Sequence, residues 1–600
     1  MTYQNQILRN KLTQTLLSAC VLFLAGCAYN STTPVTQTTV DEAGTSESVS
    51  ADDSRSSVTA ATETQAMSAH QHATAKSTTG PRRVERVAGM TANESQKLLA
   101  EVDCSVINRE LLDPPTLEAT GRVLSTRLFA ADAYKCINGK RVVLQSYFDA
   151  QAGTDRRPVG PAYIMHVAPQ NPNPQLNILF RNALGPANGD YDCDDHAGDV
   201  SKCTNLHTHG FHVSPKPGSD DVFLHLSPAD PAFQYRFDIP NTHAPGTHWL
   251  HAHLHGSTAP QVKNGMAGAL ILKGEIDRRL AADYGIGGNK EKIIILQQLE
   301  GSDDQPLCVD PVGVQLQTSI NGQCLPFLNT QAGDVFRWRL IHAGVSATVN
   351  FAINDAAGES VTLREFARDG ITMQRAIDEE NILLQPGYRS DILFKVPACP
   401  RNQYPCTLNV VDAKTIAQNS LYGVSEVKEV IARIIVTGLA SSQMRLPPTD
   451  WIQFKSPYKF IPDSELLKDA NGNPVEQKIS FASINGKQTV NGEVFPYGGT
   501  TKLKLKTATL WKIWVGKEQT TTASHPFHIH VNPFQVTQSY PNRPDFHYWK
   551  DTLLIPYTGD DPKVVTVRSR YETFDGRFVL HCHNLNHEDG GMMRTVEIHE

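Results

Sequence analysis

The sequence has no excess of positive charge. It contains 55 Lys and Arg against 62 Asp and Glu, so the formal net charge is −7. Because nucleic-acid-binding proteins need a basic surface, this balance argues against nucleic acid as a partner. Hydrophobic residues make up 40% of the chain and charged residues 20%, so most of it can bury a core. At usual domain sizes, 600 residues predict three or four domains.

The first apolar run, 16–25, is too short to span a bilayer. It follows Arg9 and Lys11 and leads directly into Leu-Ala-Gly-Cys at 24–27. This pattern resembles the signal of bacterial lipoproteins, which implies cleavage after residue 26 and a lipid anchor on Cys27. An ordinary secretory signal over 1–26 is the alternative. Both predict an exported chain, periplasmic or at the cell surface, and Ala28 in place of Asp favours the outer membrane.

Residues 28–90 contain no Leu, Ile, Phe or Trp and are rich in Ser, Thr, Ala and Gln. Such a segment cannot bury enough apolar surface to offset the entropy of ordering. We therefore expect 27–90 to be a disordered tether. Its His70 and His72 are interpreted as part of a solvated linker rather than as a metal site.

The cysteine count favours an oxidising compartment. Of 11 cysteines, eight remain when Cys20, Cys27 and Cys582 are set aside. Eight cysteines allow 105 pairings, so the connectivity is open on count alone. Pairing of sequence neighbours predicts Cys104 with Cys136, Cys193 with Cys203, Cys308 with Cys324, and Cys399 with Cys406.

Alternation with a period of two predicts strands from about residue 140 onwards, as at 176–181 and 502–506. Further β-rich runs lie at 269–272, 293–296, 335–341, 431–436, 510–515 and 577–580. Charged gaps near 275–290 and 440–450, the second of which bears proline, divide the chain into units at 91–280, with an N-terminal extension, 290–440 and 441–600. This spacing predicts an all-β fold of antiparallel sandwiches.

Histidine is unusually frequent, and 16 of the 22 lie in two windows, 207–255 and 525–587, whereas the middle unit has only His342. In a β-strand, residues i and i+2 face the same side, so a His-x-His pair directs two imidazoles to one point. One such pair is expected about 0.8 times by chance, but His-x-x-His-x-His only about 0.03 times. The pairs and longer strings are His207-Thr208-His209, His251-Ala252-His253, His525-Pro526-Phe527-His528-Ile529-His530, and His581-Cys582-His583 followed by His587 and Met592.

Cys582 alternates with His581 and His583, so its thiolate faces the opposite side of the strand. On that side, Cys582 with His525, His587 and a weak axial Met592 matches the ligand set of a blue-copper centre. Met593 is adjacent, so either methionine could instead pack in the core. On the other side, eight imidazoles without a carboxylate or second thiolate favour a copper cluster over calcium, magnesium or Cys-rich zinc.

Residues from about 140 to 600 resemble the three-domain multicopper oxidases, the laccase and metallo-oxidase superfamily. The segment 246–253, Gly-Thr-His-Trp-Leu-His-Ala-His, is similar to that family's second histidine motif, and 581–592 to its C-terminal copper signature. The spacing from Trp249 favours His251 and His253 over the overlapping His255. The resemblance implies three cupredoxin-like Greek-key sandwiches with copper, four ions per chain, and a middle unit that is a spacer shaping the substrate side. It implies type 1 copper on His525, Cys582, His587 and Met592, type 2 on His207 and His528, and the type 3 pair on His209, His251, His253, His530, His581 and His583.

The activity implied by the resemblance is oxidation of a small reducing substrate, one electron at a time, coupled to four-electron reduction of molecular oxygen to water. Cys582, with its neighbours His581 and His583, would conduct the electrons between the sites. Oxygen reduction also consumes protons, for which Glu588 and Asp220 are the candidate relays; a structural role is the alternative for both. The remaining histidines near the motifs are interpreted as supporting donors or loop residues: His212, His225, His243, His248, His255 and His547.

Other copper proteins fit the sequence less well. A copper nitrite reductase lacks the paired histidines around the cysteine, a relative without copper would lack ligands, and a copper carrier would hold more than nine Met. The same scarcity of Met argues against a Met-rich cuprous oxidase, so a phenolic or aromatic donor is favoured. An axial Met592 implies a low type 1 potential and thus an easily oxidised donor. Oxidation of Cu(I), Fe(II) or Mn(II), and a non-enzymatic copper-binding cupredoxin-fold protein, stay as alternatives.

Overall fold

The computed structural model describes residues 104–105 and 109–600, apart from gaps at 154–155, 168–172, 187, 194–199, 302–304, 310–314, 427, 452–457 and 537–546. All of these residues belong to one compact unit. The predicted signal, the anchor at Cys27 and the tether over 27–90 lie outside the described residues. No helix within the described part is long and apolar enough to cross a membrane.

The first sandwich closes around a core that takes Leu128 and Phe180 from one sheet and Leu250 and Leu270 from the other. Its five-stranded sheet has the order β1 (Thr116–Glu118), β4 (Ala162–His166), β9 (Ala267–Lys273), β8 (Gly246–His251) and β6 (His207–His209). Its four-stranded sheet has the order β3 (Lys140–Phe148), β2 (Val123–Ile137), β5 (Gln175–Ala183) and β7 (Phe233–Asp238).

The second sandwich packs Trp338 and Phe394 of one sheet against Phe351 and Ile434 of the other. The six-stranded sheet has the order β13 (Ser319–Ile320), β10 (Glu291–Gln297), β15 (Val335–His342), β20 (Arg389–Lys395), β17 (Leu363–Arg368) and β18 (Ile371–Glu379). The five-stranded sheet has the order β14 (Phe327–Ala332), β22 (Glu429–Leu439), β21 (Cys406–Asp412), β16 (Val349–Asn354) and β19 (Asn381–Leu384), and β11 (Cys308–Val309) pairs separately with β12 (Gln315–Leu316).

The third sandwich packs Trp511 and Val567 against Phe527 and Phe578. Its six-stranded sheet has the order β24 (Lys487–Val490), β23 (Glu476–Ile484), β26 (Thr507–Val515), β31 (Val565–Tyr571), β28 (Phe534–Val536) and β29 (Tyr548–Lys550). The five-stranded sheet has the order β25 (Thr501–Lys504), β33 (Met593–His599), β32 (Gly576–Cys582), β27 (His525–Ile529) and β30 (Thr552–Ile555). Short helices α2 (Thr258–Lys263), α3 (Glu275–Tyr284) and α4 (Leu585–Asp589), and 3-10 turns η1 (Gly288–Lys290) and η2 (Pro400–Asn402), complete the fold.

The predicted all-β fold is confirmed, and each predicted β-rich run lies in a strand: β9, β10, β15, β22, β26 and β32. Two details of the prediction are wrong, and one feature was not predicted. Strands begin at Thr116 rather than near residue 140, because β2, despite its run of alanines, pairs with both β3 and β5. The strand expected to reach Lys506 ends at Lys504, because Lys506 has a φ of 59° in a turn. The expected gap at 275–290 contains helix α3, whose Ile276 and Leu280 pack against the second sandwich.

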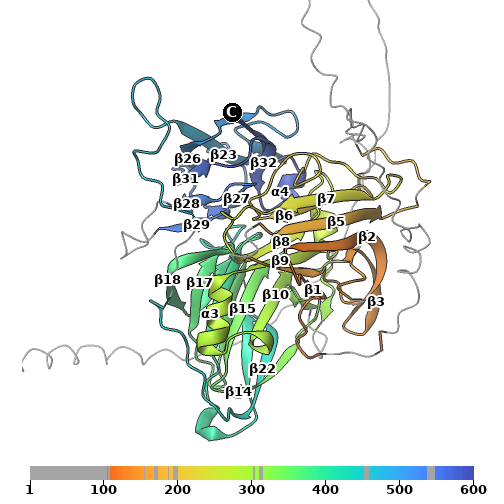
Figure 1. The fold of residues 1–600 in the computed structure, drawn as a ribbon, viewed down its shortest axis with the longest axis vertical. Helices are drawn as coiled ribbons and strands as arrows, with labels where there is room; N and C mark the ends of the chain where they lie inside the picture. The colour runs from red at the N-terminus through yellow and green to blue at the C-terminus, as the bar shows by residue number, and fades with distance from the viewer. Residues whose placement is uncertain are drawn as a thin grey trace, which may run out of the picture. The chain divides into compact units, whose positions relative to one another are not determined.

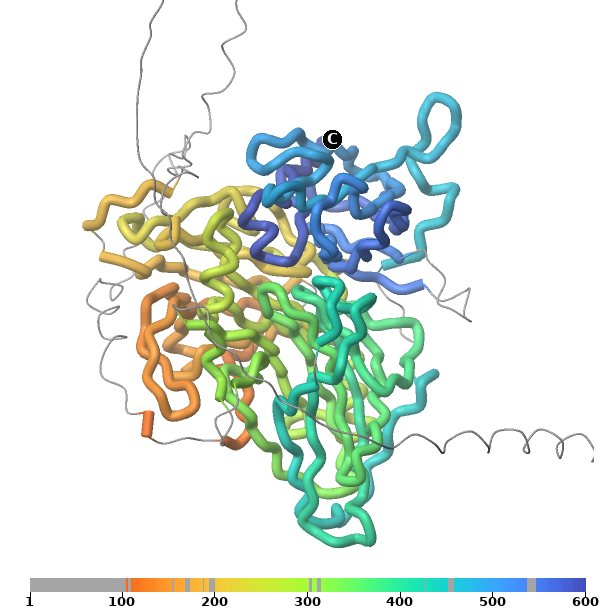
Figure 2. Tube along the Cα trace, turned by 180° about the vertical axis from the view of Figure 1, so that it is seen from behind, coloured from red at the N-terminus to blue at the C-terminus, as the bar shows by residue number. Residues whose placement is uncertain are grey.

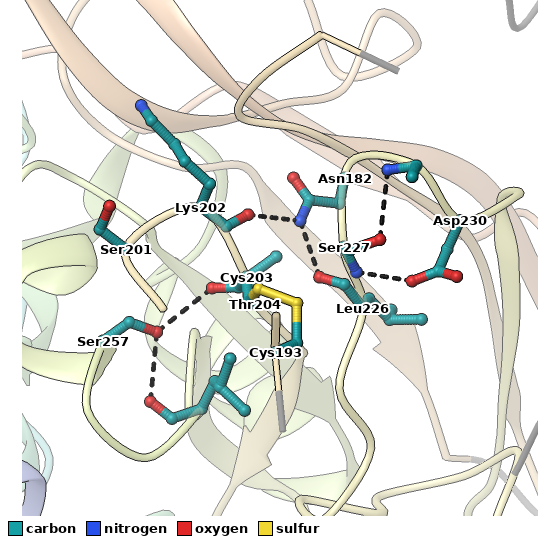
Figure 3. Close-up of a disulfide and its surroundings, with 12 residues drawn as sticks. Asn182, Cys193, Ser201, Lys202, Cys203, Thr204, Leu226, Ser227, Asp230 and Ser257 are labelled. Atoms are coloured by element: carbon teal, nitrogen blue, oxygen red, sulfur yellow. Dashed lines mark hydrogen bonds between the residues drawn. A yellow bond between two sulfur atoms is a disulfide. The ribbon is translucent and has the colours of Figure 1, made fainter. Parts of the chain in front are cut away.

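The four predicted disulfides are confirmed: Cys104–Cys136, Cys193–Cys203, Cys308–Cys324 and Cys399–Cys406. Figure 3 shows Cys193–Cys203, which lies just before strand β6. The carbonyl of Cys203 accepts a hydrogen bond from Ser257 Oγ at 3.2 Å, and Asn182 Nδ2 donates to the carbonyls of Lys202 and Leu226, each at 2.8 Å. The segment that leads into His207 is therefore fixed on both sides.

Candidate metal centre

Two pairs of short antiparallel strands carry the histidine strings. In the first sandwich, β6 pairs with β8, with His207 opposite His251 and His209 opposite Trp249. In the third sandwich, β27 pairs with β32, with His528 opposite His581. Figures 1 and 2 show these yellow and blue segments next to one another, and the histidine contacts described below join them. Each strand pair therefore brings two strings to one place.

The two strand pairs together form one cluster of eight imidazoles. His253 Nε2 lies 3.1 Å from both His530 Nε2 and His581 Nε2, and His583 Nε2 lies 3.1 Å from His209 Nδ1. All eight members are at most 1% exposed: His207, His209, His251, His253, His528, His530, His581 and His583. Half of the cluster comes from the first sandwich and half from the third, so neither sandwich forms it alone.

Ring nitrogens at the centre of this cluster lack hydrogen bonds. Within the described part of the chain, Nε2 of His207, of His251 and of His528 has no hydrogen-bond partner. Burial is the largest cause that lowers the pKa of each of these histidines, so the imidazoles are neutral. A buried polar atom without a partner is unfavourable, whereas a neutral imidazole nitrogen is a common metal ligand. The donor set therefore fits a metal cluster, and eight imidazoles suit copper.

Hydrogen bonds on the opposite ring nitrogens orient these imidazoles. Asp220 is buried and its carboxylate lies 3.0 Å from His207 Nδ1, while it accepts the N–H of Thr208 at 2.9 Å. Burial raises the pKa of Asp220 to about 8. His251 Nδ1 lies 2.8 Å from the Ala252 carbonyl, and His528 Nδ1 lies 2.8 Å from the carbonyl of Asp551. When one nitrogen is held in this way, the other is free to face a metal.

On the opposite face of β32, Cys582 begins a second site. Its Sγ lies 3.5 Å from His525 Nδ1 and 3.7 Å from His587 Nδ1, and the two Nδ1 atoms are 3.2 Å apart. Among the described residues, Cys582 is the only cysteine outside a disulfide. Burial raises the pKa of its thiol, so a thiolate there requires a cation. One thiolate between two imidazoles is a donor set for copper.

The sequence left open whether Met592 or Met593 lies at the cysteine site, and in the structure the two side chains pack in different clusters. Met592 is fully buried in the same hydrophobic cluster as Cys582, and its carbonyl accepts the Cys582 N–H at 3.1 Å. Met593 packs with Val222 and Val579 in a different cluster. Met592 therefore shares the core of the third sandwich with Cys582, whereas Met593 does not.

Glu588 lies on α4 beside the eight-histidine cluster. It is fully buried, its Oε1 accepts a hydrogen bond from Thr258 Oγ1 at 3.2 Å, and it lies 3.6 Å from His253 Nδ1. Burial raises the pKa of this carboxyl group. Both predicted relay residues are therefore buried carboxyl groups next to cluster histidines.

The other histidines near the motifs lie outside the cluster. Nδ1 of His212 lies 2.8 Å from the Val531 carbonyl, and Nδ1 of His243 lies 2.8 Å from its neighbouring Ala244 carbonyl. The ring of His248 makes edge-to-face contacts with the rings of Phe211 and His243, and His547 packs on Phe460. The ring of His255 packs on Phe495, so the cluster takes His251 and His253 from the overlapping string.

Sequence reasoning missed several polar residues that contact the imidazoles, among them Gln519 and Asp551. Gln519 Oε1 accepts from His525 Nε2 at 2.6 Å. Asp551 Oδ1 lies 3.2 Å from His209 Nε2, and Asp551 is placed between β29 and β30. Neither residue belongs to a histidine string, and no local pattern distinguishes them.

Three β-sandwiches that hold a buried thiolate–imidazole site and a buried histidine cluster define a copper protein of the cupredoxin-like class. Two multicopper oxidase family models match residues 198–276 and 466–600. The chain is 23% identical over 427 residues to a multicopper oxidase of Staphylococcus aureus, covering 70% of this chain and 82% of the relative. It is 23% identical over 405 residues to a laccase of Bacillus subtilis, covering 60% of this chain and 72% of the relative.

Solved structures show the same fold. The structure of a Campylobacter jejuni multicopper oxidase, described as a metallo-oxidase, superposes with a TM-score of 0.60 at 21% identity, covering 84% of this chain and 98% of that one. The family models and the homologues both indicate a multicopper oxidase, a copper-dependent oxidoreductase that uses O2 as the electron acceptor.

Proposed function

We propose that the chain is a laccase-like multicopper oxidase that holds four coppers, with the ligands that the sequence motifs assign. The observation that carries this proposal is the pair of sites on one strand, a thiolate–imidazole site on one face of β32 and eight clustered imidazoles on the other. Bound copper would supply one-electron oxidation of a donor at the Cys582 site and four-electron reduction of O2 to water at the cluster.

The protein itself provides the connection between the two sites. Cys582 lies between His581 and His583 in the chain, so a short covalent path joins its sulfur to imidazoles of the cluster. Phe527 and Ile529 pack beside Cys582 in the core of the third sandwich and exclude water from this path. Asp220, buried against His207, and Glu588, buried near His253, would hold a proton for O2 reduction.

The surface next to His587 supports an aromatic donor. His587 is 9% exposed, whereas His525 is fully buried, so electrons can enter through the His587 edge. Asn584 Nδ2 lies 3.3 Å from His587 Nε2 and 3.1 Å from the Tyr422 hydroxyl. The ring of Tyr422, 39% exposed, therefore borders this edge, and the same segment of the chain carries the exposed Ile416 and Val424, at 53% and 57%. A phenol can pack on such side chains, whereas a hydrated metal ion gains nothing from them.

Oxidation of a metal ion is the second candidate. It is supported by Glu426, a half-buried carboxylate in the same segment of the second sandwich, whose Oε1 accepts from Ser420 Oγ at 2.8 Å. Carboxylate oxygens are ligands for hard cations such as Mn(II).

Oxygen consumption by the copper-loaded protein distinguishes the two candidates. We expect uptake with 2,6-dimethoxyphenol, slower or no uptake with cuprous or ferrous ion, and none with either donor for Cys582→Ser. Uptake with metal ions alone would replace the laccase-like proposal with a metallo-oxidase. Protein that carries four coppers but consumes no oxygen with any donor would refute the oxidase function.

We also propose that the mature chain is a lipoprotein of the cell envelope, anchored through Cys27, on the grounds of the lipobox alone. Labelling of expressing cells with a fatty-acid analogue should mark the wild-type chain and not Cys27→Ser. Equal labelling of both would contradict the anchor.

A further inference from the structure

Arg389 lies at a point where all three sandwiches meet. The residue begins β20 and its side chain is fully buried. Its guanidinium donates to Thr247 of the first sandwich at 3.3 Å, to the Gly387 and Asp369 carbonyls of the second at 2.9 and 3.0 Å, and to the Asp551 carboxylate of the third. Both terminal nitrogens bind this carboxylate, Nη1 to Oδ1 at 2.7 Å and Nη2 to Oδ2. All five N–H groups are therefore used.

The carboxylate that Arg389 holds is the one that contacts the cluster. Asp551 Oδ1 lies 3.2 Å from His209 Nε2, and the opposite nitrogen of that ring, Nδ1, lies 3.1 Å from His583 Nε2. An N–H on Nε2 donated to Asp551 leaves the Nδ1 lone pair directed into the cluster. The Asp551 carbonyl also lies 2.8 Å from His528 Nδ1, so one residue orients two imidazoles.

The second sandwich holds the backbone of this segment as well. Asp369 Oδ2 accepts the N–H groups of Asp551 at 3.2 Å and of Thr552 at 3.3 Å, and pairs with Lys550 at 3.1 Å. There is little free space: a Cβ placed on Gly210, next to His209, would lie 2.3 Å from Arg389 Nη2 and 2.8 Å from Asp551 Oδ2. The carboxylate thus has no room for another rotamer on that side.

We infer that Arg389 is a positioning residue of the eight-histidine cluster: it holds the Asp551 carboxylate on His209 Nε2 and so fixes the ring with Nδ1 towards the metal. The middle sandwich is then more than a spacer, because it determines the orientation of a ligand that it does not itself supply. This inference rests on the proposed copper cluster.

Two physical effects support this role. A carboxylate on the outer nitrogen of a ligating histidine fixes its tautomer and increases its basicity, and its loss commonly weakens metal binding about 10–100-fold. A buried carboxylate stays charged only when it is paired, and the planar fork of arginine matches both oxygens, which lysine cannot do. Without Arg389, the Asp551 carboxylate would lose the bidentate contact that holds it in place, and His209 Nε2 would lose a fixed partner.

The test compares copper content and two spectroscopic signals in purified, copper-loaded variants. For Arg389→Gln and Asp551→Asn we expect about 10–100-fold weaker retention of cluster copper against a chelator, with a weaker near-ultraviolet absorption of the type 3 copper pair, to which the sequence motifs assign His209. The blue absorption of the Cys582 site should stay, because that site does not contact Asp551 through any described bond. Arg389→Lys should give an intermediate loss.

Arg339→Gln is the matched control. Arg339 is also fully buried and paired with Asp277, Glu291 and Asp391, but it contacts no cluster histidine through a described bond. We expect it to lower the thermal midpoint while keeping the cluster copper. Equal loss of cluster copper in Arg339→Gln would overturn the inference in favour of general destabilisation.

Wild-type retention and spectra in both Arg389→Gln and Asp551→Asn would also overturn it. If Arg389→Gln is insoluble, the isosteric Asp551→Asn decides. Wild-type protein that shows the blue absorption but binds no cluster copper would overturn the proposed cluster and this inference together. This outcome is seen in the wild-type protein, so it is distinguished from failure of the Arg389 inference, which only the variants can show.

Discussion

Replacement of Asp412 by Asn should stabilise the protein increasingly as the pH rises from about 4 to about 7, with the full gain above pH 7. Asp412 ends β21 and lies mostly buried, with its Oδ1 accepting the Asn350 N–H at 2.8 Å. Burial, with Glu429 and Glu426 adding negative charge nearby, raises the pKa of its carboxyl group to about 7, against an ordinary value of 3.8. Glu429 is its direct partner across β21 and β22.

The sign of the effect follows from proton binding. In the unfolded chain this carboxyl group loses its proton near pH 4, whereas in the folded protein it keeps the proton until about pH 7. Between these values the folded state binds more protons than the unfolded state, so this group lowers stability as the pH rises, and above pH 7 the full penalty is present. At about 1.4 kcal/mol for each pKa unit, a shift of about 3 units gives a penalty of up to about 4 kcal/mol.

The amide of Asn keeps the acceptor for Asn350 and removes the charge. Asp412→Asn should therefore leave the thermal midpoint at pH 4 unchanged and raise it at pH 8, by roughly 2–4 °C for each kcal/mol in a domain of this size. Differential scanning calorimetry of both proteins across this range measures the effect. Asp412→Ala is the control: it loses the hydrogen bond, worth about 1 kcal/mol, and should be less stable than Asp412→Asn at every pH. A gain for Asp412→Asn that is the same at pH 4 and pH 8 would refute the reasoning.

Three further outcomes are expected. Glu588→Gln should slow oxygen consumption while copper content, measured by metal analysis, is unchanged; wild-type turnover would exclude a relay role. Gly246→Ala should lower the thermal midpoint strongly, because its Cβ would lie 1.7 Å from the Gly370 carbonyl oxygen. Gly438→Ala is the control and should lower the midpoint far less, because no atom lies within 4 Å of the added carbon. Equal midpoints in the two variants would contradict the close approach at Gly246. Tyr422→Ala should raise KM for a phenol and leave oxidation of ferrous ion unchanged in oxygen-uptake assays; an unchanged phenol KM would argue against the apolar edge.

Local patterns carried the predictions that succeeded. The His-x-His strings, the alternation of Cys582 with its neighbours and the neighbour-paired cysteines each depend on residues close together in the chain. The strand β2 was missed because the apolar positions of its Ala-rich stretch are small, and its place is decided by pairing with β5, some 50 residues later. Helix α3 was missed because its apolar face is short and packs on the second sandwich.

The contacts that orient the imidazoles are long-range, and this is why the sequence did not reveal them. Arg389 and Asp551 are 162 residues apart, and His209 and Asp551 are 342 apart. Each residue taken alone is an ordinary charged side chain at the end of a strand. These residues form one network only when the three sandwiches pack together, and the periodic patterns in the sequence do not predict how they pack.

The position of the cluster explains why such a network is needed. Several buried ring nitrogens of the cluster have no partner, which is unfavourable, so contacts between imidazoles alone contribute little attraction between the first and third sandwiches before metal binds. Other groups provide that attraction: Asp589 on α4 accepts the N–H groups of Gly256, Thr258 and Ala259 at the start of α2, at 2.8, 3.1 and 2.7 Å. Together with the hydrogen bonds of Arg389, this contact joins the three sandwiches without metal. The ligands are thereby brought together in advance, and metal binding needs to order little of the chain, which favours tight binding.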